Sequence, residues 1–288
     1  MYDELIGRTE YELFPGIVWH RFDVRTDHAI DEHAPMKEAL GISYCHAGRI
    51  GWKLNNGTSF FLGSGDILLH SHDLCADSRL SFPLNYCHGI TIQVNLTEME
   101  RDFPEILRDA GITTQMIYDK FCAIGRAVII PAMDKTDRIL SECFECPKEL
   151  RIAYYKLKIQ ELLIFLCKSE QVFTKEVPWC YSQHTEIIRE VHAFLTENLD
   201  QRYTIEELAK RFAMNTSTLK LVFKAVYGQP IAAYMKEYRI RKAMELLRTT
   251  DDSIADIAVQ MGYRSQSRFS EAFKNVVDIL PTDYRKQI

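Results

Sequence analysis

The spacing of hydrophobic positions changes along this chain of 288 residues. From about Tyr11 to Leu96, apolar and polar residues alternate in short runs separated by turns, which is typical of β-strands. Asn56-Gly57 lies between two such runs and predicts a hairpin turn. From Glu98 to Lys168 the apolar residues recur every three or four positions, which predicts helices. We therefore expect a β-rich region followed by helices.

The clearest amphipathic helix is predicted for residues 148–168. Its apolar side chains fall on one wide face, as in helices that pack on a core. They are Ile152, Tyr155, Ile159, Leu162, Leu163 and Leu166. We expect most of this face to cover the preceding strands.

The C-terminal part carries an internal repeat, whose copies begin at Thr204 and Ser253. Each opens with a Ser or Thr three residues before an acid, which is the spacing of a capping box. An apolar stripe, a short turn (residues 213–215 or 262–264) and a second apolar stripe follow. Two short helices joined by a tight turn form a helix-turn-helix, so the repeat predicts two of them.

A third helix is predicted between the two copies, because the segment after Pro230 has a helical apolar stripe and no Gly or Pro. About 18 residues of helix would span about 27 Å. Elements that read one face of a DNA duplex lie one helical turn apart, about 34 Å. The length of the helix is compatible with such an arrangement.

Composition changes between the two parts of the chain. Residues 171–183 break the periodic pattern and predict a linker between a domain of residues 1–170 and a domain of residues 184–288. After Tyr181 there are 16 Lys and Arg against 14 Asp and Glu, a net charge of +2, and the preceding part has 19 against 26, a net charge of −7. Nine basic residues oppose two acids within Lys210–Arg248. This basic zone supports binding to nucleic acid only together with a reading element.

Other sequence features indicate where the protein is located and what its cysteines do. No run of 18 apolar residues predicts a membrane span, and the N-terminus lacks the features of a signal peptide, so we expect a cytoplasmic protein with no membrane partner. The eight cysteines, Cys75 among them, are typical of core residues in a reducing compartment. Cys143 and Cys146 have metal or redox spacing, but no second pair completes four ligands nearby, so we favour helix packing.

Residues from about His184 to the end resemble the DNA-binding domain of the AraC/XylS family of bacterial transcription regulators. The duplicated motif carries the resemblance, together with "SIADIAVQMGYRSQSRFSEAFK", "FKAVYGQP" and "PTDYRK". It implies a multidomain α and β protein, with a cupin-like β-barrel and following helices before an all-α domain of two helix-turn-helix motifs joined by a linker helix. It also implies binding to promoter DNA as a homodimer, with RNA polymerase as a further partner.

The N-terminal residues of each second helix are expected to face the major groove. The expected base-reading residues are Thr216, Ser217, Lys220 and Leu221 in the first copy and Gln266, Ser267, Arg268 and Glu271 in the second. Asn215 and Ser265 are expected to cap these helices. Lys224, Lys274 and Arg285 are expected to contact phosphates.

Three positions depart from the family pattern. Relatives often carry arginine where this chain has Leu221 and Glu271, so an arginine–guanine contact is not expected there. Asp278 stands where the family usually has a helix-ending glycine, and Asp tolerates the left-handed conformation better than most residues.

The segment "NGTSFFLGSGDILL" resembles half of a cupin motif, and regulators of this family commonly sense a ligand with such a barrel. Leu68 stands where the motif would place a metal-binding His. His70 and His72 with His46 or His88 remain an alternative metal site, although polar residues at a strand end are the favoured interpretation. The candidate ligand contacts are Trp19, Tyr44, Trp52, His70, His72 and Tyr86.

The favoured function is a ligand-responsive, sequence-specific DNA-binding regulator with no catalytic residue, cofactor or metal. One alternative is a cupin-type metalloprotein or enzyme fused to a DNA-binding domain. Another is a DNA-binding dimer that senses no small molecule.

Overall fold

A computed structural model describes residues 8–31, 36, 38–72, 78–123, 127–169, 175–176 and 179–287. The chain divides into two compact units, Met1–Tyr181 and Ser182–Ile288. The expected linker, residues 171–183, lies partly outside the described residues, and so does Cys75.

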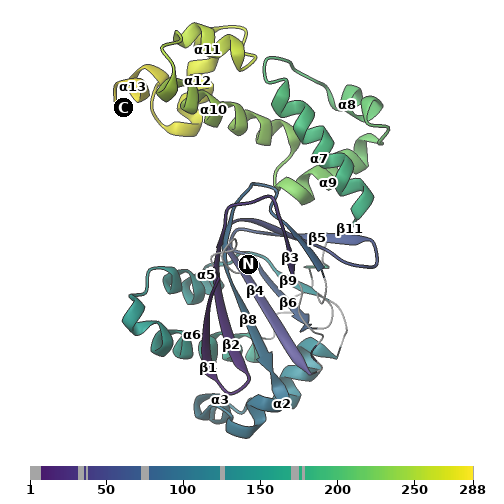
Figure 1. Ribbon diagram of the computed structural model, residues 1–288, viewed down its shortest axis with the longest axis vertical. Helices are drawn as coiled ribbons and strands as arrows, with labels where there is room; N and C mark the ends of the chain where they lie inside the picture. The colour runs from purple at the N-terminus through teal and green to yellow at the C-terminus, as the bar shows by residue number, and fades with distance from the viewer. Residues whose placement is uncertain are drawn as a thin grey trace. The chain divides into compact units, whose positions relative to one another are not determined.

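The N-terminal unit contains a sheet of antiparallel strands (Figure 1). They are β1 (Thr9–Phe14), β2 (Ile17–Val24), β3 (His28–Asp31), β4 (Ala39–Lys53), β5 (Thr58–Gly63), β6 (Ile67–Ser71), β7 (Ser78–Ser81), β8 (Cys87–Asn95), β9 (Val128–Ile130), β10 (Lys175–Glu176) and β11 (Cys180–Tyr181). The sequence therefore predicted a β-rich region correctly. Closure into a cupin-like barrel stays a prediction.

Strand β4 belongs to two groups of strands. Its first part pairs with β6 and β8, in the order β1-β2-β8-β4-β6-β9-β10. Its second part pairs with β5 and β7. The register shifts between Cys45 and Ala47, and such a bulge bends a strand and re-aims its side chains. The predicted hairpin is confirmed, because β4 and β5 pair around Gly57, which has a φ of +79°.

The two faces of the sheet both carry a hydrophobic core. Successive strand side chains point to opposite faces, so Trp19 and Phe22 of β2 lie on different sides. Trp19 belongs to a core shared with helices, and Phe22 belongs to a second core with Trp52 and Phe60. Burial on both faces removes the polar alternation that would mark a solvent-facing side.

Helices cover the first face. They are α2 (Leu96–Met99), α3 (Glu105–Asp109), α4 (Thr114–Ile117), α5 (Asp134–Leu140) and α6 (Arg151–Lys168), with the short 3₁₀ helices η2 (Glu100–Asp102), η4 (Ser141–Phe144) and η5 (Lys148–Leu150) and the π-helix η3 (Tyr118–Cys122). The helix predicted for residues 148–168 is confirmed as α6 with η5 before it. Five of its six expected core residues are buried, but Ile152 in the first turn is 53% exposed.

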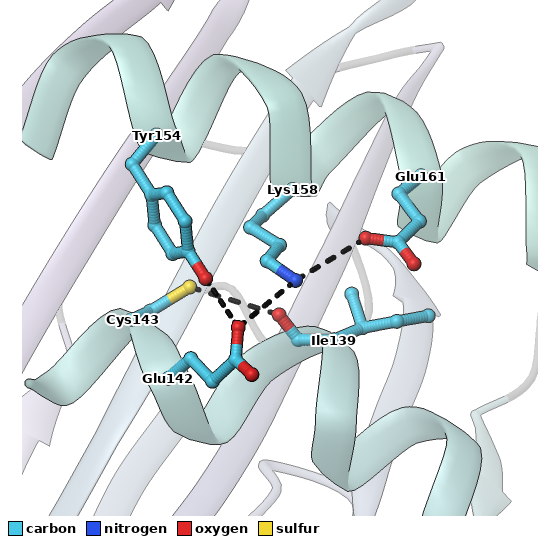
Figure 2. Close-up of polar contacts among 6 residues, drawn as sticks. All are labelled: Ile139, Glu142, Cys143, Tyr154, Lys158 and Glu161. Carbon is cyan, nitrogen blue, oxygen red and sulfur yellow. Dashed lines mark hydrogen bonds and ion pairs between the residues drawn. The ribbon is translucent and has the colours of Figure 1, made fainter. Parts of the chain in front are cut away.

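Polar side chains tie η4 to α6, as Figure 2 shows. Lys158 of α6 lies 3.4 Å from the carboxylates of both Glu142 and Glu161. The Tyr154 hydroxyl donates to Glu142. Cys143 of η4 is buried, and burial raises the pKa of its thiol to about 12. A thiol that stays protonated and buried is consistent with packing.

The C-terminal unit is helical. Its helices are α7 (Ser182–Glu197), α8 (Ile205–Arg211), α9 (Thr216–Tyr227), α10 (Ile231–Thr249), α11 (Ile254–Gln260), α12 (Gln266–Val277) and α13 (Pro281–Lys286). Within this unit, α10 runs from the group of α7, α8 and α9 to the group of α11, α12 and α13 (Figure 1). Across the described part of the chain, no helix combines the length and apolar character needed to cross a membrane.

Candidate nucleic-acid interface

The first helix-turn-helix begins at a complete capping box. The Thr204 hydroxyl accepts from the Glu207 main-chain N–H at 3.2 Å, and the Glu207 carboxylate accepts from the Thr204 N–H at 2.7 Å. Two donors that a helix start would leave unsatisfied are thereby paired. The chain then turns through Ala213, whose φ is +49°. Asn215 caps α9, as the sequence predicted, by accepting from the Thr218 N–H at 2.7 Å.

The second copy repeats the N-caps and the turn. Ser253 caps α11 by accepting from the Asp256 main-chain N–H at 3.1 Å. The turn after α11 passes through Gly262, whose φ is +69°. Ser265 then caps α12 by accepting from the Arg268 main-chain N–H at 3.3 Å, which confirms the predicted cap. The pair of matched units was therefore visible in the sequence.

The ends of α9 and α12 also correspond. Gly228 ends α9 with a φ of +83°, and Asp278 ends α12 with a φ of +64°. Each main-chain N–H donates to a carbonyl four residues earlier, at 2.8 Å in both copies. Asp278 therefore adopts the left-handed conformation that its position in the repeat predicted.

One face of each second helix is core and the other is exposed. Leu219 and Phe223 of α9 and Phe269 and Phe273 of α12 are buried, as predicted. On the opposite faces, the exposed side chains are Ser217, Lys220, Leu221 and Lys224 of α9 and Gln266, Ser267, Arg268, Glu271 and Lys274 of α12, and Thr216 is half-buried. Within the described residues, none of these side chains is committed to an intramolecular hydrogen bond or ion pair. Each helix thus keeps a polar face available to a partner.

One basic residue of this unit does not contribute to an exposed basic surface. Arg239, one of the nine basic residues counted above, is only 4% exposed. Burial, and then the nearby charge of Arg202, lower the pKa of its guanidinium to about 10. Arg239 is a structural residue, and the basic zone that can face DNA is smaller than the sequence suggested.

Arg285 of α13 is half-buried. Its Nε and Nη2 atoms are buried and have no hydrogen-bond partner in the described part of the chain. Lys224 and Lys274, by contrast, are exposed. The phosphate contacts expected for these three residues stay predictions.

Known proteins resemble this unit closely. Residues 208–287 match a family model described as a helix-turn-helix domain. Regulatory protein SoxS of Escherichia coli strain K12 is 35% identical over 105 residues, which cover 36% of this chain and 98% of SoxS. The chain belongs to the AraC/XylS family. It is accordingly an AraC-type, helix-turn-helix, DNA-binding transcription regulator.

Further AraC/XylS proteins also match part of the chain. The melibiose operon regulatory protein of Escherichia coli strain K12 is 35% identical over 106 residues, 36% of this chain and 35% of that protein. The crystallised DNA-binding domain of AdpA, in complex with a target DNA, is 28% identical, covers 35% of this chain and 90% of that chain, and has a TM-score of 0.34. Each of these matches spans about a third of the chain.

In the N-terminal unit of this AraC/XylS protein, the six candidate ligand contacts do not form one group. Trp19 stacks on Tyr155 of α6 at 4.7 Å, and the Tyr44 hydroxyl donates to Asp137 of α5 at 2.8 Å. Both belong to the helix-covered core. Trp52 lies in the second core, where it stacks on Phe60, and Tyr86 is 39% exposed.

His70 and His72 do lie together, on the same face of the sheet as the second core. His70 is two residues beyond Leu68 of that core, and its ring covers Gly41, where an added Cβ would lie 2.4 Å from the ring. Gln93 pairs with Gly41 across β4 and β8, and its Nε2 lies 3.0 Å from Nε2 of His72. No group of three or more potential metal ligands occurs within the described residues.

Sequence reasoning missed Gln93 and Ser43 as neighbours of these histidines. Ser43 is two residues from Gly41 on β4, and its Oγ is buried without a hydrogen-bond partner in the described part of the chain. Neither residue belongs to a motif. The available signal was strand register, which requires knowledge of which strands pair.

Proposed function

We propose that this protein is an effector-responsive transcription regulator. It reads two successive DNA segments, one with α9 and the other with α12. The main support is that both helices bury their apolar side chains at matched positions. Near their N-termini, their polar side chains at matched positions make no intramolecular hydrogen bond or ion pair among the described residues. Side chains at the start of a recognition helix are the ones that reach base edges in the major groove. Arg268 suits a guanine or a phosphate, Gln266 an adenine, and the exposed Leu221 the methyl group of thymine.

Binding to the protein's own upstream region tests this proposal. We expect a sequence-selective mobility shift, which a double variant Lys220→Ala/Arg268→Ala abolishes because it alters both reading helices. Lys236→Ala is a suitable control, since Lys236 is an exposed lysine of α10 that lies outside both reading helices. An absence of selective binding by the unaltered protein, with or without cell metabolites, would contradict the proposal.

The N-terminal unit is proposed to bind the effector on the face of the sheet that carries His70, His72, Gln93 and Ser43. A buried Ser43 Oγ without a partner among the described residues is costly unless some group pairs with it. Small-molecule sites are mostly apolar with a few placed polar groups, and here the second core supplies the apolar surroundings. The effector is accordingly a small molecule with hydrogen-bonding groups.

Thermal unfolding against a panel of metabolites identifies such an effector. A compound that binds the folded unit raises the melting temperature. Ser43→Ala and Gln93→Leu should each reduce that rise, whereas Ser78→Ala should not. Ser78 also has a buried Oγ without a hydrogen-bond partner among the described residues, but it lies on β7. Equal loss in all three variants would indicate general destabilisation and contradict the assigned site.

Association into a homodimer through α6 is proposed as well. Leu150, the N-cap residue of α6, and Leu157 of α6 lie seven residues apart, and each is 58% exposed. Positions seven residues apart repeat on one helix face, and exposed apolar patches of this kind mark interaction surfaces. A second copy would present the same stripe, as a two-fold axis requires.

A further inference from the structure

Residues 199–202, part of the loop that joins α7 to α8, are attached to the middle of α10. Arg239 of α10 donates from Nε to the Leu199 carbonyl and from Nη2 to the Gln201 carbonyl, each at 2.9 Å. A buried guanidinium is retained where its donors are satisfied, and these two carbonyls satisfy two of them. The loop precedes the first helix-turn-helix, so this contact fixes the first half of the unit to α10.

The same loop also touches the turn of the second helix-turn-helix. Arg202 donates from Nε to the Gly262 carbonyl at 3.2 Å, and its guanidinium lies 5.0 Å from the centroid of the Tyr263 ring. A Cβ added at Gly262 would lie 2.7 Å from the Asp200 carbonyl oxygen and 2.8 Å from that of Leu199. The loop and the turn are therefore in main-chain contact. Leu199 also packs against the core of the second half.

These contacts give the two reading units a second connection beside α10. A helix of 19 residues is about 28 Å long, and a single helix between two small bodies leaves bending and rotation at its middle unopposed. The loop meets α10 near its middle, at Arg239, and meets the second unit at Gly262. Movement of α12 relative to α9 would have to break the contacts of Arg202, Arg239 or both.

We propose that residues 199–202 form a clasp that fixes the separation and angle of α9 and α12 and thereby sets the spacing between the two DNA segments that the protein accepts. This inference rests on the proposed reading of DNA by both helices. One inserted base pair moves the second segment by about 3.4 Å and rotates it by about 35°. A rigid pair of helices cannot follow that change, whereas a flexible pair can.

The test begins with DNA that the full-length protein selects from random duplexes, followed by duplexes with one or two base pairs added or removed between the two selected segments. For the unaltered protein we expect the Kd to rise at least about tenfold with one added base pair. Arg202→Ala and Tyr263→Leu should each reduce that penalty to less than about threefold, while binding to a duplex that carries one segment stays unchanged.

Arg211→Ala is the matched control. The Arg211 guanidinium lies 4.0 Å from the centroid of the Phe194 ring, so this pair has the same chemistry but lies wholly within the first half. Arg202 and Arg211 are both exposed, and circular dichroism checks that both variants fold. Arg211→Ala should keep the full spacing penalty.

The outcomes separate the two proposals. A full spacing penalty in both Arg202→Ala and Tyr263→Leu, or an equal loss of it in Arg211→Ala, would overturn the clasp alone. Failure of the unaltered protein to select any two-segment DNA would overturn the clasp together with the DNA reading on which it rests.

Discussion

Arg239 and Leu199 are 40 residues apart in the chain and joined by a hydrogen bond of 2.9 Å inside the C-terminal unit. Hydrogen bonds from a charged donor contribute about 1.5–3 kcal/mol each, and their loss leaves the accepting carbonyls without that donor. We expect Arg239→Ala to lower the free energy of unfolding of the C-terminal unit by about 3 kcal/mol.

Two spectroscopic probes make this measurable in the full-length chain. All three tryptophans, Trp19, Trp52 and Trp179, lie in the N-terminal unit, so their fluorescence reports that unit. Circular dichroism at the helix band reports the helical C-terminal unit as well. Arg239→Ala should move the dichroism transition to lower urea and leave the fluorescence transition in place. Coincident shifts of both would show that the effect is not confined to the C-terminal unit.

Arg268 and Lys274 of α12 should respond differently to truncation. Arg268→Ala is expected to cost about 1–3 kcal/mol on the preferred DNA and to relax the preference at one base pair. Lys274→Ala should weaken binding to all sequences alike and reduce the slope of log K against log salt by about 1. Titrations at three salt concentrations, on preferred and scrambled duplexes, distinguish the two. A uniform loss with Arg268→Ala would assign it to the phosphate backbone.

His192 should make the C-terminal unit sensitive to acid. Burial lowers the pKa of this imidazole from 6.5 to about 4, and its Nε2 lies 2.9 Å from the Tyr234 hydroxyl. Below about pH 6.5 the imidazole is therefore protonated in the unfolded chain, whereas in the folded unit it stays neutral until about pH 4. Stability is greatest above pH 6.5 and falls as the pH decreases through this window, by at most about 3 kcal/mol.

Urea unfolding between pH 4.5 and 7.5, followed by circular dichroism, checks this dependence on pH. His192→Gln keeps a hydrogen-bonding group and cannot titrate, so its stability should change less over the same range. An identical pH slope in the variant would assign the acid sensitivity to other groups.

Leu157 should control association if copies of α6 pack together. Leu157→Glu places a charge in the exposed stripe, and we expect the dimer to weaken by at least about tenfold in Kd. Ile152→Glu is the matched control, because Ile152 is also an exposed apolar residue of α6 but lies on the other side of the helix. Light scattering coupled to gel filtration measures both. A monomeric unaltered protein at high concentration would contradict the proposal.

Asp278 offers a stabilising change. A φ of +64° is sterically unfavourable for an L-residue but not for glycine. Gly228 occupies the matching position of the first copy. We expect Asp278→Gly to raise the free energy of unfolding by up to about 1 kcal/mol and Asp278→Val to lower it. Urea unfolding of both variants checks the sign, and a stabilised Val variant would contradict the argument.

The elements of the C-terminal unit could be predicted because their signals are local. Thr204 and Ser253 each predict the start of a helix together with an acid three residues later, and the apolar stripes predict the buried faces. Repetition of the same signals made the two units recognisable. By contrast, the role of Arg239 depends on carbonyls 38 and 40 residues away, so sequence reasoning placed it in a basic surface that it does not join.

The N-terminal unit was harder for a different physical reason. Both faces of its sheet are buried, so the alternation of polarity no longer tells which side chains face helices and which face the second core. Trp19 and Tyr44 were candidate ligand contacts on composition alone, whereas their positions against Tyr155 and Asp137 give them packing partners. Ser43 gave no signal because its position near His70 and Gln93 depends on how β4 pairs with β6 and β8.

The crossing of residues 199–202 from one half to the other has a consequence for protein engineering. A segment that begins at Ser253 contains a complete helix-turn-helix, yet it lacks the main chain that lies against Gly262 and the Arg202 side chain that covers Tyr263. Without Leu199, such a fragment would expose the core surface that this side chain packs against when grafted onto another protein. The smallest transplantable module is therefore the whole segment from Ser182 onward, although the duplication suggests that half would suffice.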